Sequence, residues 1–254
     1  MIADVIAWLT SAESWTGDGM ILDRLVEHLL YTALAMAFAL AIALPIGLWV
    51  GHTGRGRWLI SAANAVRAVP TLGLLFALAL WLGPYLGRTT AFLVPSIVVL
   101  SLLAIPPILS GVYAGIEAVD PAARDAARGI GMTGRQVLWG VEVPVALPLV
   151  LSGIRAATLQ VVATATVAAF IGLGGLGRFI IDGLAVQDYA QTAGGALLVA
   201  LLALALDGVL AVVQRLVVSP GLTSRPTRGR RRIPLRPATR LSNTDPVTTT
   251  GGTP

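Results

Sequence analysis

Long apolar stretches alternate with short polar segments along the chain from residue 28 to residue 218. The apolar stretches cover residues 29–50, 69–82, 91–113, 145–171 and 193–213. A helix over residues 29–50 is about 33 Å long at about 1.5 Å per residue, which matches a hydrocarbon core of about 30 Å. The pattern therefore predicts an all-α, polytopic membrane protein with about five transmembrane helices joined by short loops.

The second apolar stretch has two interpretations because it begins at Pro70. Proline has no N–H to donate, and it disfavours helix in the residue before it. One interpretation places a partly interfacial helix at residues 58–68 and the second transmembrane helix at residues 69–82. The other is a single tilted helix over residues 58–82.

Other residues inside the apolar stretches are costly in a membrane. Pro106 and Pro107 leave helix carbonyls unpaired unless neighbouring helices or water satisfy them, so they indicate either a bend that faces a polar passage or a packed kink. Arg155 lies near one end of its stretch, where its long side chain can reach the interface. Asp207 is expected to pair with Arg155, to pair with another residue, or to face a water-filled space.

Composition agrees with this picture and excludes several kinds of function. The chain is 56% hydrophobic and 12% charged, whereas a soluble domain carries about a quarter charged residues. The absence of cysteine excludes disulfides, thiolate metal sites and cysteine nucleophiles. His28 and His52 flank the first span, so no metal site is expected. No paired carboxylates, P-loop or nucleophile–base set can be assembled, and we expect neither an enzyme nor a cofactor.

Residues 172–177 read GLGGLG, which fits the spelling of a dinucleotide-binding loop. Such a loop follows a β-strand, whereas this one follows a predicted membrane helix. Gly174 and Gly175 are better explained by close helix packing, or as the lining of the outer end of a passage. The segment 172–191 is predicted to be the longest loop on its face of the membrane.

The two ends of the chain differ in composition from the membrane domain at residues 28–218. Residues 1–27 predict an extracytoplasmic N-terminal arm, either loosely ordered or carrying a short interfacial helix. Residues 219–254, rich in Arg, Pro and Thr, predict a disordered cytoplasmic tail. Beside the last span, contact of this tail with anionic lipid, or simple disorder, is favoured over nucleic acid.

Arginine is unevenly divided between the two faces of the membrane domain. One face carries Arg55, Arg57, Arg124, Arg128 and Arg135 in short loops, together with Arg215 and the tail. The other face carries Arg24, Arg88 and Arg178. The positive-inside rule makes the first face cytoplasmic, with the N-terminus outside and the C-terminus inside.

The polar segment 117–144 lies on the arginine-rich face. Asp120 is a suitable N-cap and Pro121 suits the first helical position, so a helix is predicted to about Ile130, with a break near Gly131 and Gly134. A short helix lying along the membrane face can dock onto a soluble partner. Its arginines are suited to acidic groups on that partner or to lipid headgroups. An ordinary basic loop would have the same composition.

The same segment carries a motif. The EAA loop of ABC importer permeases reads Glu-Ala-Ala, three residues, Gly, nine residues, Ile, one residue, Leu-Pro. Here these places hold Asp125-Ala126-Ala127, Gly131, Val141 and Val143-Pro144. With the flanking text GMTGRQVL and ATVAAFIGLGGLG, the region from residue 67 to residue 207 resembles the glycine betaine/choline/carnitine (osmoprotectant) permeases.

The resemblance implies the type I ABC importer permease fold, with a cytoplasmic coupling helix in a bacterial cell membrane. It implies that ATPase coupling involves Arg124, Asp125, Ala126, Ala127, Gly131, Arg135, Val141 and Pro144. Candidates for the pathway or for helix packing are Pro70, Pro106, Pro107, Arg155, Gly174, Gly175 and Asp207. The implied partners are two ATPase subunits that hydrolyse ATP, a second permease subunit, an extracytoplasmic binding protein and membrane lipid.

The implied function is uptake of osmoprotectants such as glycine betaine, choline, carnitine or proline betaine by alternating access. Two alternatives stay open from the residues. One keeps the importer class and changes the cargo to methionine, another amino acid or an oxyanion. The other is an ATP-independent secondary carrier or a membrane scaffold, for which an internal repeat would be a sign.

Overall fold

A computed structural model of the chain describes residues 2–88 and 90–218. The predicted tail at residues 219–254 lies outside the described residues. Within the described ranges the chain is helical and contains no β-strand, which confirms the all-α prediction.

The helices follow one another with short connections. In chain order they are α1 (Ile2–Thr10), α2 (Ile21–Thr53), α3 (Trp58–Ala65), α4 (Thr71–Leu82), α5 (Thr90–Glu117), α6 (Pro121–Gly129), α7 (Gly134–Val137), α8 (Val143–Ala168), α9 (Gly177–Ala185) and α10 (Tyr189–Val217). Short 3-10 turns cover Ala12–Ser14, Val66–Ala68, Gly83–Tyr85 and Ala169–Ile171, and a π-helical turn, η4, covers Leu138–Glu142.

Four segments of the described chain are long and apolar enough to cross a membrane. They are α2, α5, the continuous run Gly134–Ile171 and α10. A fifth crossing is available to a bent pair, Trp58–Ala68 and Thr71–Tyr85, whose axes meet at 91°. This agrees with the prediction of about five transmembrane helices.

The bend between α3 and α4 lies at Pro70, where the sequence predicts a break. Val69 is extended (φ −75°, ψ 129°) because the following proline disfavours helix there. The single tilted helix over residues 58–82 is therefore wrong. Residues 69–82 are also wrong as a complete span, since the 12 residues of α4 reach about 18 Å of the roughly 30 Å required.

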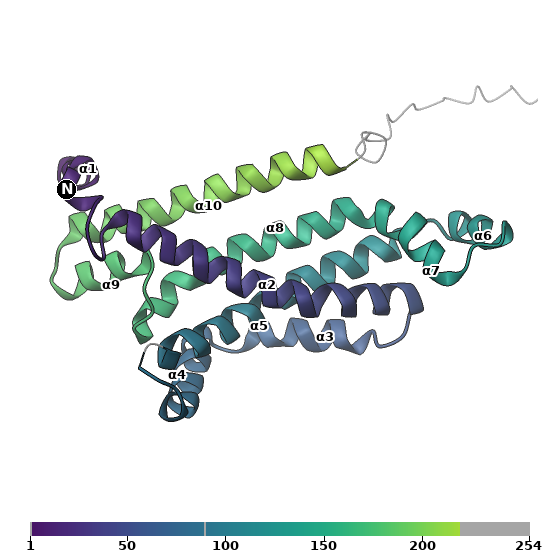
Figure 1. The fold of residues 1–254 in the computed structure, drawn as a ribbon, viewed down its shortest axis with the longest axis horizontal. Helices are drawn as coiled ribbons and strands as arrows, with labels where there is room; N and C mark the ends of the chain where they lie inside the picture. Colours follow the sequence, from purple (N-terminus) through teal and green to yellow (C-terminus); the bar gives the residue numbers. More distant parts are fainter. Residues whose placement is uncertain (1, 89, 219–254) are drawn as a thin grey trace, which may run out of the picture. The chain divides into compact units, whose positions relative to one another are not determined.

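Figure 1 shows α6 and α7 at one end of the helical bundle and α1 and α9 at the other, here called the α6 end and the α9 end. Helices α2, α5 and α10 run toward the α6 end, and α8 runs back. The bent pair α3–α4 brings the chain back from the α6 end to the start of α5. The start of α2 and the end of α10 therefore lie at opposite ends of the bundle.

The core lies where α5 packs against both α2 and α8. Small residues bring these helices together. A Cβ added at Gly47 of α2 would lie 2.8 Å from the Val112 side chain, and one at Gly153 of α8 would lie 2.6 Å from the Pro107 carbonyl. Lipid tails are as apolar as the helices, so helices in a membrane associate through close packing of this kind.

The double proline of α5 belongs to this core. Pro106 and Pro107 are both buried, and the carbonyl of Pro107 faces Gly153 of α8. Close approach of α8 is possible there because Gly153 has no side chain. This placement favours the packed kink over a bend that faces a passage.

The predicted outer loop at residues 172–191 is only partly a loop, because residues Gly177–Ala185 form α9. Phe179 of α9 is buried, and its ring meets the Trp8 ring of α1 edge-on with centroids 5.2 Å apart. Asp188 then caps α10 by accepting hydrogen bonds from the N–H groups of Ala190 and Gln191, each at 3.0 Å. Helix α9 packs against Trp8, which is remote in sequence, so the local composition did not predict this helix.

The N-terminal region is more helical than a loosely ordered arm. Residues Ile2–Thr10 form α1, which packs on α10, and this fits the alternative of a short helix. The first long helix begins at Ile21, well before the predicted start of the span at residue 29. Its acidic first turns are stabilised locally, since Arg24 donates to Glu27 at 2.8 Å.

Candidate functional site

Helix α6 follows α5 and precedes α7 in the chain, and it lies at the end of the bundle opposite to α9 (Figure 1). It begins as predicted: the Asp120 side chain accepts a hydrogen bond from the Ala122 N–H at 2.9 Å, and Pro121 occupies the first helical position. Both features satisfy the geometry of a helix start without help from other parts of the chain.

Helix α6 ends in a Schellman motif centred on Gly131. The Gly131 N–H donates to the Arg128 carbonyl at 2.9 Å, and the Met132 N–H donates to the Ala127 carbonyl at 3.1 Å. Gly131 has φ +92°, a left-handed conformation that glycine adopts without steric cost. The glycine of the motif is therefore required by backbone geometry.

Replacing Gly131 with alanine should loosen the end of α6. Holding alanine in the left-handed region costs about 1–2 kcal/mol. We expect faster hydrogen exchange of the α6 amides in the detergent-solubilised protein. Gly129 is the matched control, since it has ordinary helical geometry and open space around a Cβ. Equal exchange in Gly131→Ala and Gly129→Ala would contradict the proposed role of the turn.

The chain becomes helical again directly after this turn. Thr133 and Gln136 form a capping box, in which the Gln136 side chain accepts from the Thr133 N–H at 2.8 Å. The predicted break near Gly134 thus lies earlier, because Gly134 is already the first residue of α7. The run Gly134–Ile171 is one continuous helical segment.

Three predicted coupling residues therefore lie in that helical run and not in a loop, the first of them Arg135 in α7. Val141 belongs to the π-helical turn η4, and Pro144 follows in the first turn of α8. Proline is tolerated there because it stands at the start of the α-helical hydrogen-bond pattern. The polar loop is consequently shorter than the predicted 117–144.

The side chains of α6 divide into an inner and an outer face. Ala127 is buried, and Arg124 is turned inward. Asp125, Ala126 and Arg128 are exposed, as is Arg135 in α7. Ile130, which follows α6, is 82% exposed. The outer face is thus small, polar and open, with one apolar residue at its edge.

The inner face of α6 meets a carboxylate that the sequence analysis missed. Glu142 is 1% exposed, and its two oxygens lie 2.8 Å from Arg124 Nε and 2.6 Å from His52 Nδ1. The available signal was one acidic residue in the otherwise apolar run VEVP. Its partners are remote in sequence, so they could not be inferred from spacing.

Arg155 and Asp207, both predicted to need compensation, form an ion pair between α8 and α10. Two guanidinium nitrogens of Arg155 donate to the two carboxylate oxygens of Asp207. A second polar contact joins the same helices, since Gln214 Nε2 donates to the Pro148 carbonyl at 3.2 Å. The pair therefore fastens α10 to the core.

Gly174 and Gly175 lie at the α9 end and pack against the start of α2. The Glu27 carboxylate accepts a hydrogen bond from the Gly175 N–H at 2.7 Å, and a Cβ at Gly174 would overlap that carboxylate. Gly174 also lines a cavity of about 470 Å³, together with Arg24, Tyr31 and Arg88. Close packing explains these glycines directly.

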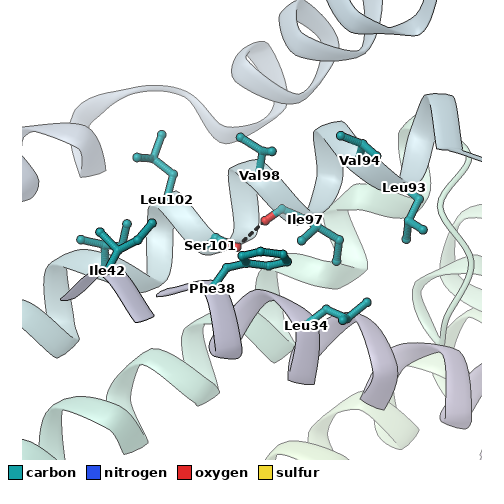
Figure 2. Close-up of a pocket in the computed structure, with 10 residues that line it drawn as sticks. Leu34, Phe38, Ile42, Leu93, Val94, Ile97, Val98, Ser101 and Leu102 are labelled. Atoms are coloured by element: carbon teal, nitrogen blue, oxygen red, sulfur yellow. Dashed lines mark hydrogen bonds between the residues drawn. The ribbon is translucent and has the colours of Figure 1, made fainter. Parts of the chain in front are cut away.

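Two of the pathway candidates line different cavities: Pro106 lines one between α2, α3 and α5, and Gly174 lines the one at the α9 end. A groove of about 450 Å³ lies between α2 and α5, and Figure 2 shows Phe38, Ile42 and Val98 around it. Its lining is apolar, and the hydroxyl of Ser101 is taken up by the Ile97 carbonyl at 2.6 Å. None of the predicted candidates lines this groove, and the described residues contain no group of side chains arranged to hold a metal.

The described residues thus form a bundle of about five candidate membrane passes with a capped short helix exposed at one end. The chain belongs to the family of binding-protein-dependent transport system inner membrane components, whose model matches residues 21–219. This confirms the family inferred from the EAA-type motif and places the protein in a membrane.

Relatives of known function are similar over most of their length. One is the glycine betaine/carnitine/choline transport system permease protein OpuCB of Bacillus subtilis (strain 168), 36% identical over 82% of this chain and 93% of that protein. Another is the osmoprotectant import permease protein OsmW of Salmonella typhimurium, 33% identical over 80% of this chain and 94% of that protein.

Solved structures share the fold. The methionine ABC transporter MetNI in an inward-facing conformation contains a chain with a TM-score of 0.67 and 23% identity, covering 81% of this chain and all of that one. A chain of an amino acid ABC transporter crystallised with histidines has a TM-score of 0.61 and 21% identity, covering 77% and 92%. At this identity the likeness shows the fold alone, and it confirms the predicted importer permease fold.

Proposed function

We propose that this protein is the permease subunit of an ABC importer for osmoprotectants such as glycine betaine, choline, carnitine and proline betaine. The identities of 33–36% to OpuCB and OsmW over most of each chain support this cargo. Transport proceeds by alternating access, driven by a separate subunit that hydrolyses ATP. A secondary carrier is disfavoured because the family belongs to binding-protein-dependent systems.

The exposed face of α6 carries the proposal. Asp125 and Ala126 point away from the bundle, while Ala127 and Arg124 hold the helix against it. A helix fixed on one side and open on the other suits docking into a groove of a soluble ATPase. The small Ala126 side chain lets the partner approach the helix backbone closely.

The arginine distribution supports the proposed orientation. Arg55, Arg57, Arg124, Arg128 and Arg135 all belong to connections at the α6 end, and Arg215 lies in the last turn of α10. We therefore assign the α6 end to the cytoplasm. The N-terminus and the α9 end face outward, where a substrate-binding protein docks.

A second permease subunit completes the pathway, since about five passes form half of one. Helix α10 offers a surface for this subunit, because none of the residues in its most apolar 18-residue window is buried within this chain. That helix is covered by lipid or by the second subunit. The second subunit is a copy of this chain or a related permease. Two permeases present two α6 helices and so bind two ATPase subunits.

Substituting Ala126 with arginine tests the docking face. A large charged side chain should block close approach and reduce ATPase co-purification in mild detergent by about tenfold, equivalent to about 1.4 kcal/mol. The matched control is Ala185→Arg, at an exposed alanine that ends the nine-residue helix α9 at the opposite end. Wild-type co-purification of the ATPase with Ala126→Arg would overturn the assignment of α6.

The cargo is tested separately by uptake under osmotic stress. Cells that carry the importer should accumulate labelled glycine betaine, and cells that lack this permease should not. Labelled methionine serves as the comparison cargo. Uptake of methionine without betaine would leave the importer assignment intact and overturn the osmoprotectant assignment.

A further inference from the structure

A buried carboxylate lies beneath the helix that we assign to ATPase docking. Glu142 is 1% exposed, and a carboxylate removed from water is costly unless it is paired and hydrogen-bonded. Both of its oxygens are paired, one with Arg124 and the other with His52. Neither partner is near Glu142 in sequence, so the three residues meet only in the folded protein.

Each member of this cluster belongs to a different structural element. Arg124 is in α6, His52 is in the last turn of α2, and Glu142 ends the π-helical turn that leads into α8. The distances are 2.8 Å from Arg124 Nε to Glu142 Oε1 and 2.6 Å from His52 Nδ1 to Glu142 Oε2. The carboxylate thus links the docking helix to two membrane helices.

Arg124 makes a further contact that brings in the third core helix. Its Nη2 donates to the carbonyl of Ile116 in the last turn of α5. Ile116 itself packs against Gly51 of α2, where a Cβ would lie 2.7 Å from the isoleucine side chain. The ends of α2, α5 and α8 therefore converge beneath α6.

The π-helical turn explains how Glu142 reaches this position. Residues Leu138–Glu142 form a turn wider than an α-helix, and such turns re-aim side chains within a helical run and are frequent at functional sites. The turn lies between α7 and α8 and so stands where the docking segment joins the membrane span. Val137 and Ala146 on either side are buried, which anchors this part of the run.

We propose that Glu142 is the positioning residue that fastens α6 to α2, α5 and α8, so that a displacement imposed on α6 reaches all three core helices together. The proposal rests on the assignment of α6 as the ATPase-docking helix. Without the carboxylate, Arg124 has no counter-charge and α6 can move without its membrane helices. The cluster then determines how much of the motion of the ATPase becomes movement of the permease.

A second ion pair at the same end supplies the control. Arg57 pairs with Glu117, but these side chains are 63% and 51% exposed. Exposed pairs of this kind contribute little, because water and salt screen them. Glu117→Gln removes a carboxylate at the same end without touching the buried cluster.

The first measurement follows α6 in the isolated full-length permease in lipid nanodiscs. The chain has no cysteine, so spin labels can be attached at Ala122→Cys in α6 and Thr53→Cys at the end of α2, both exposed positions. By double electron–electron resonance, Glu142→Gln should broaden the distance distribution roughly twofold, as expected for a locally released element. Glu117→Gln should leave the distribution unchanged.

The second measurement is transport coupling in the reconstituted importer. The amount of substrate transported per ATP hydrolysed should fall in Glu142→Gln, while the ATPase still co-purifies. A merely structural defect would lower transport and ATP hydrolysis in proportion. The double variant Arg124→Gln/Glu142→Gln removes both buried charges and keeps the test valid if the single variant folds poorly.

The outcomes separate this proposal from the assignment of α6. A wild-type distance distribution and a wild-type ratio of substrate to ATP in the double variant would overturn the role of Glu142. Failure of the unmodified permease to bind any ATPase would instead overturn the docking assignment. The spin-label result on the isolated permease would still report whether the cluster holds α6 in place.

Discussion

Replacing Gly153 with leucine should strongly destabilise the folded permease. A side chain at this position collides with the backbone of α5, since its Cβ would lie 2.6 Å from the Pro107 carbonyl and 3.1 Å from the Gly111 Cα. Backbone atoms of a buried helix cannot rotate aside as a flexible side chain can. Overpacking typically costs about 1–3 kcal/mol, so the melting temperature in detergent should fall by about 5–10 °C.

The matched control is Gly208→Leu in α10. Gly208 also lies in a membrane helix, but a Cβ there would meet nothing within 4 Å. We expect this variant to melt close to the wild type, because leucine also has the better helix propensity. A Gly153→Leu protein as stable as Gly208→Leu would show that α8 does not pack on α5 as described.

Removing one member of the Arg155–Asp207 pair should harm the protein more than removing both. Asp207→Leu leaves the Arg155 guanidinium in a membrane helix without its counter-charge, a costly arrangement. The double variant Arg155→Leu/Asp207→Leu removes both charges and replaces them with apolar side chains suited to lipid. We expect the yield of folded protein in mild detergent to fall in the single variant and to recover in the double variant.

Thermal unfolding of the same proteins provides a second readout for the pair. If the two side chains interact, the double variant is more stable than the summed effects of the two single substitutions predict. Gln214→Leu, which removes the neighbouring hydrogen bond to Pro148, is a useful comparison because it breaks an uncharged link between the same helices. Additive effects of Arg155→Leu and Asp207→Leu would contradict the ion pair.

Features that depend on neighbouring residues could be predicted from the amino-acid sequence. Runs of apolar side chains predict the membrane passes because these side chains can face lipid, while the helix pairs its own backbone N–H and C=O groups. Asp120 with Pro121 predicts the start of α6, and Gly131 predicts its end, since capping and left-handed backbone geometry are local properties. The spacing of Asp125 to Pro144 was sufficient to infer the family, which the matching family model confirms.

Contacts between distant residues became known only from the folded arrangement of the helices. This arrangement paired Glu142 with His52 and turned Arg124 inward, away from the exposed face of α6. It also paired Arg155 with Asp207, one of several partners that the sequence left open. Burial and charge compensation arise between helices far apart in the chain, so periodicity and spacing carry no record of these contacts.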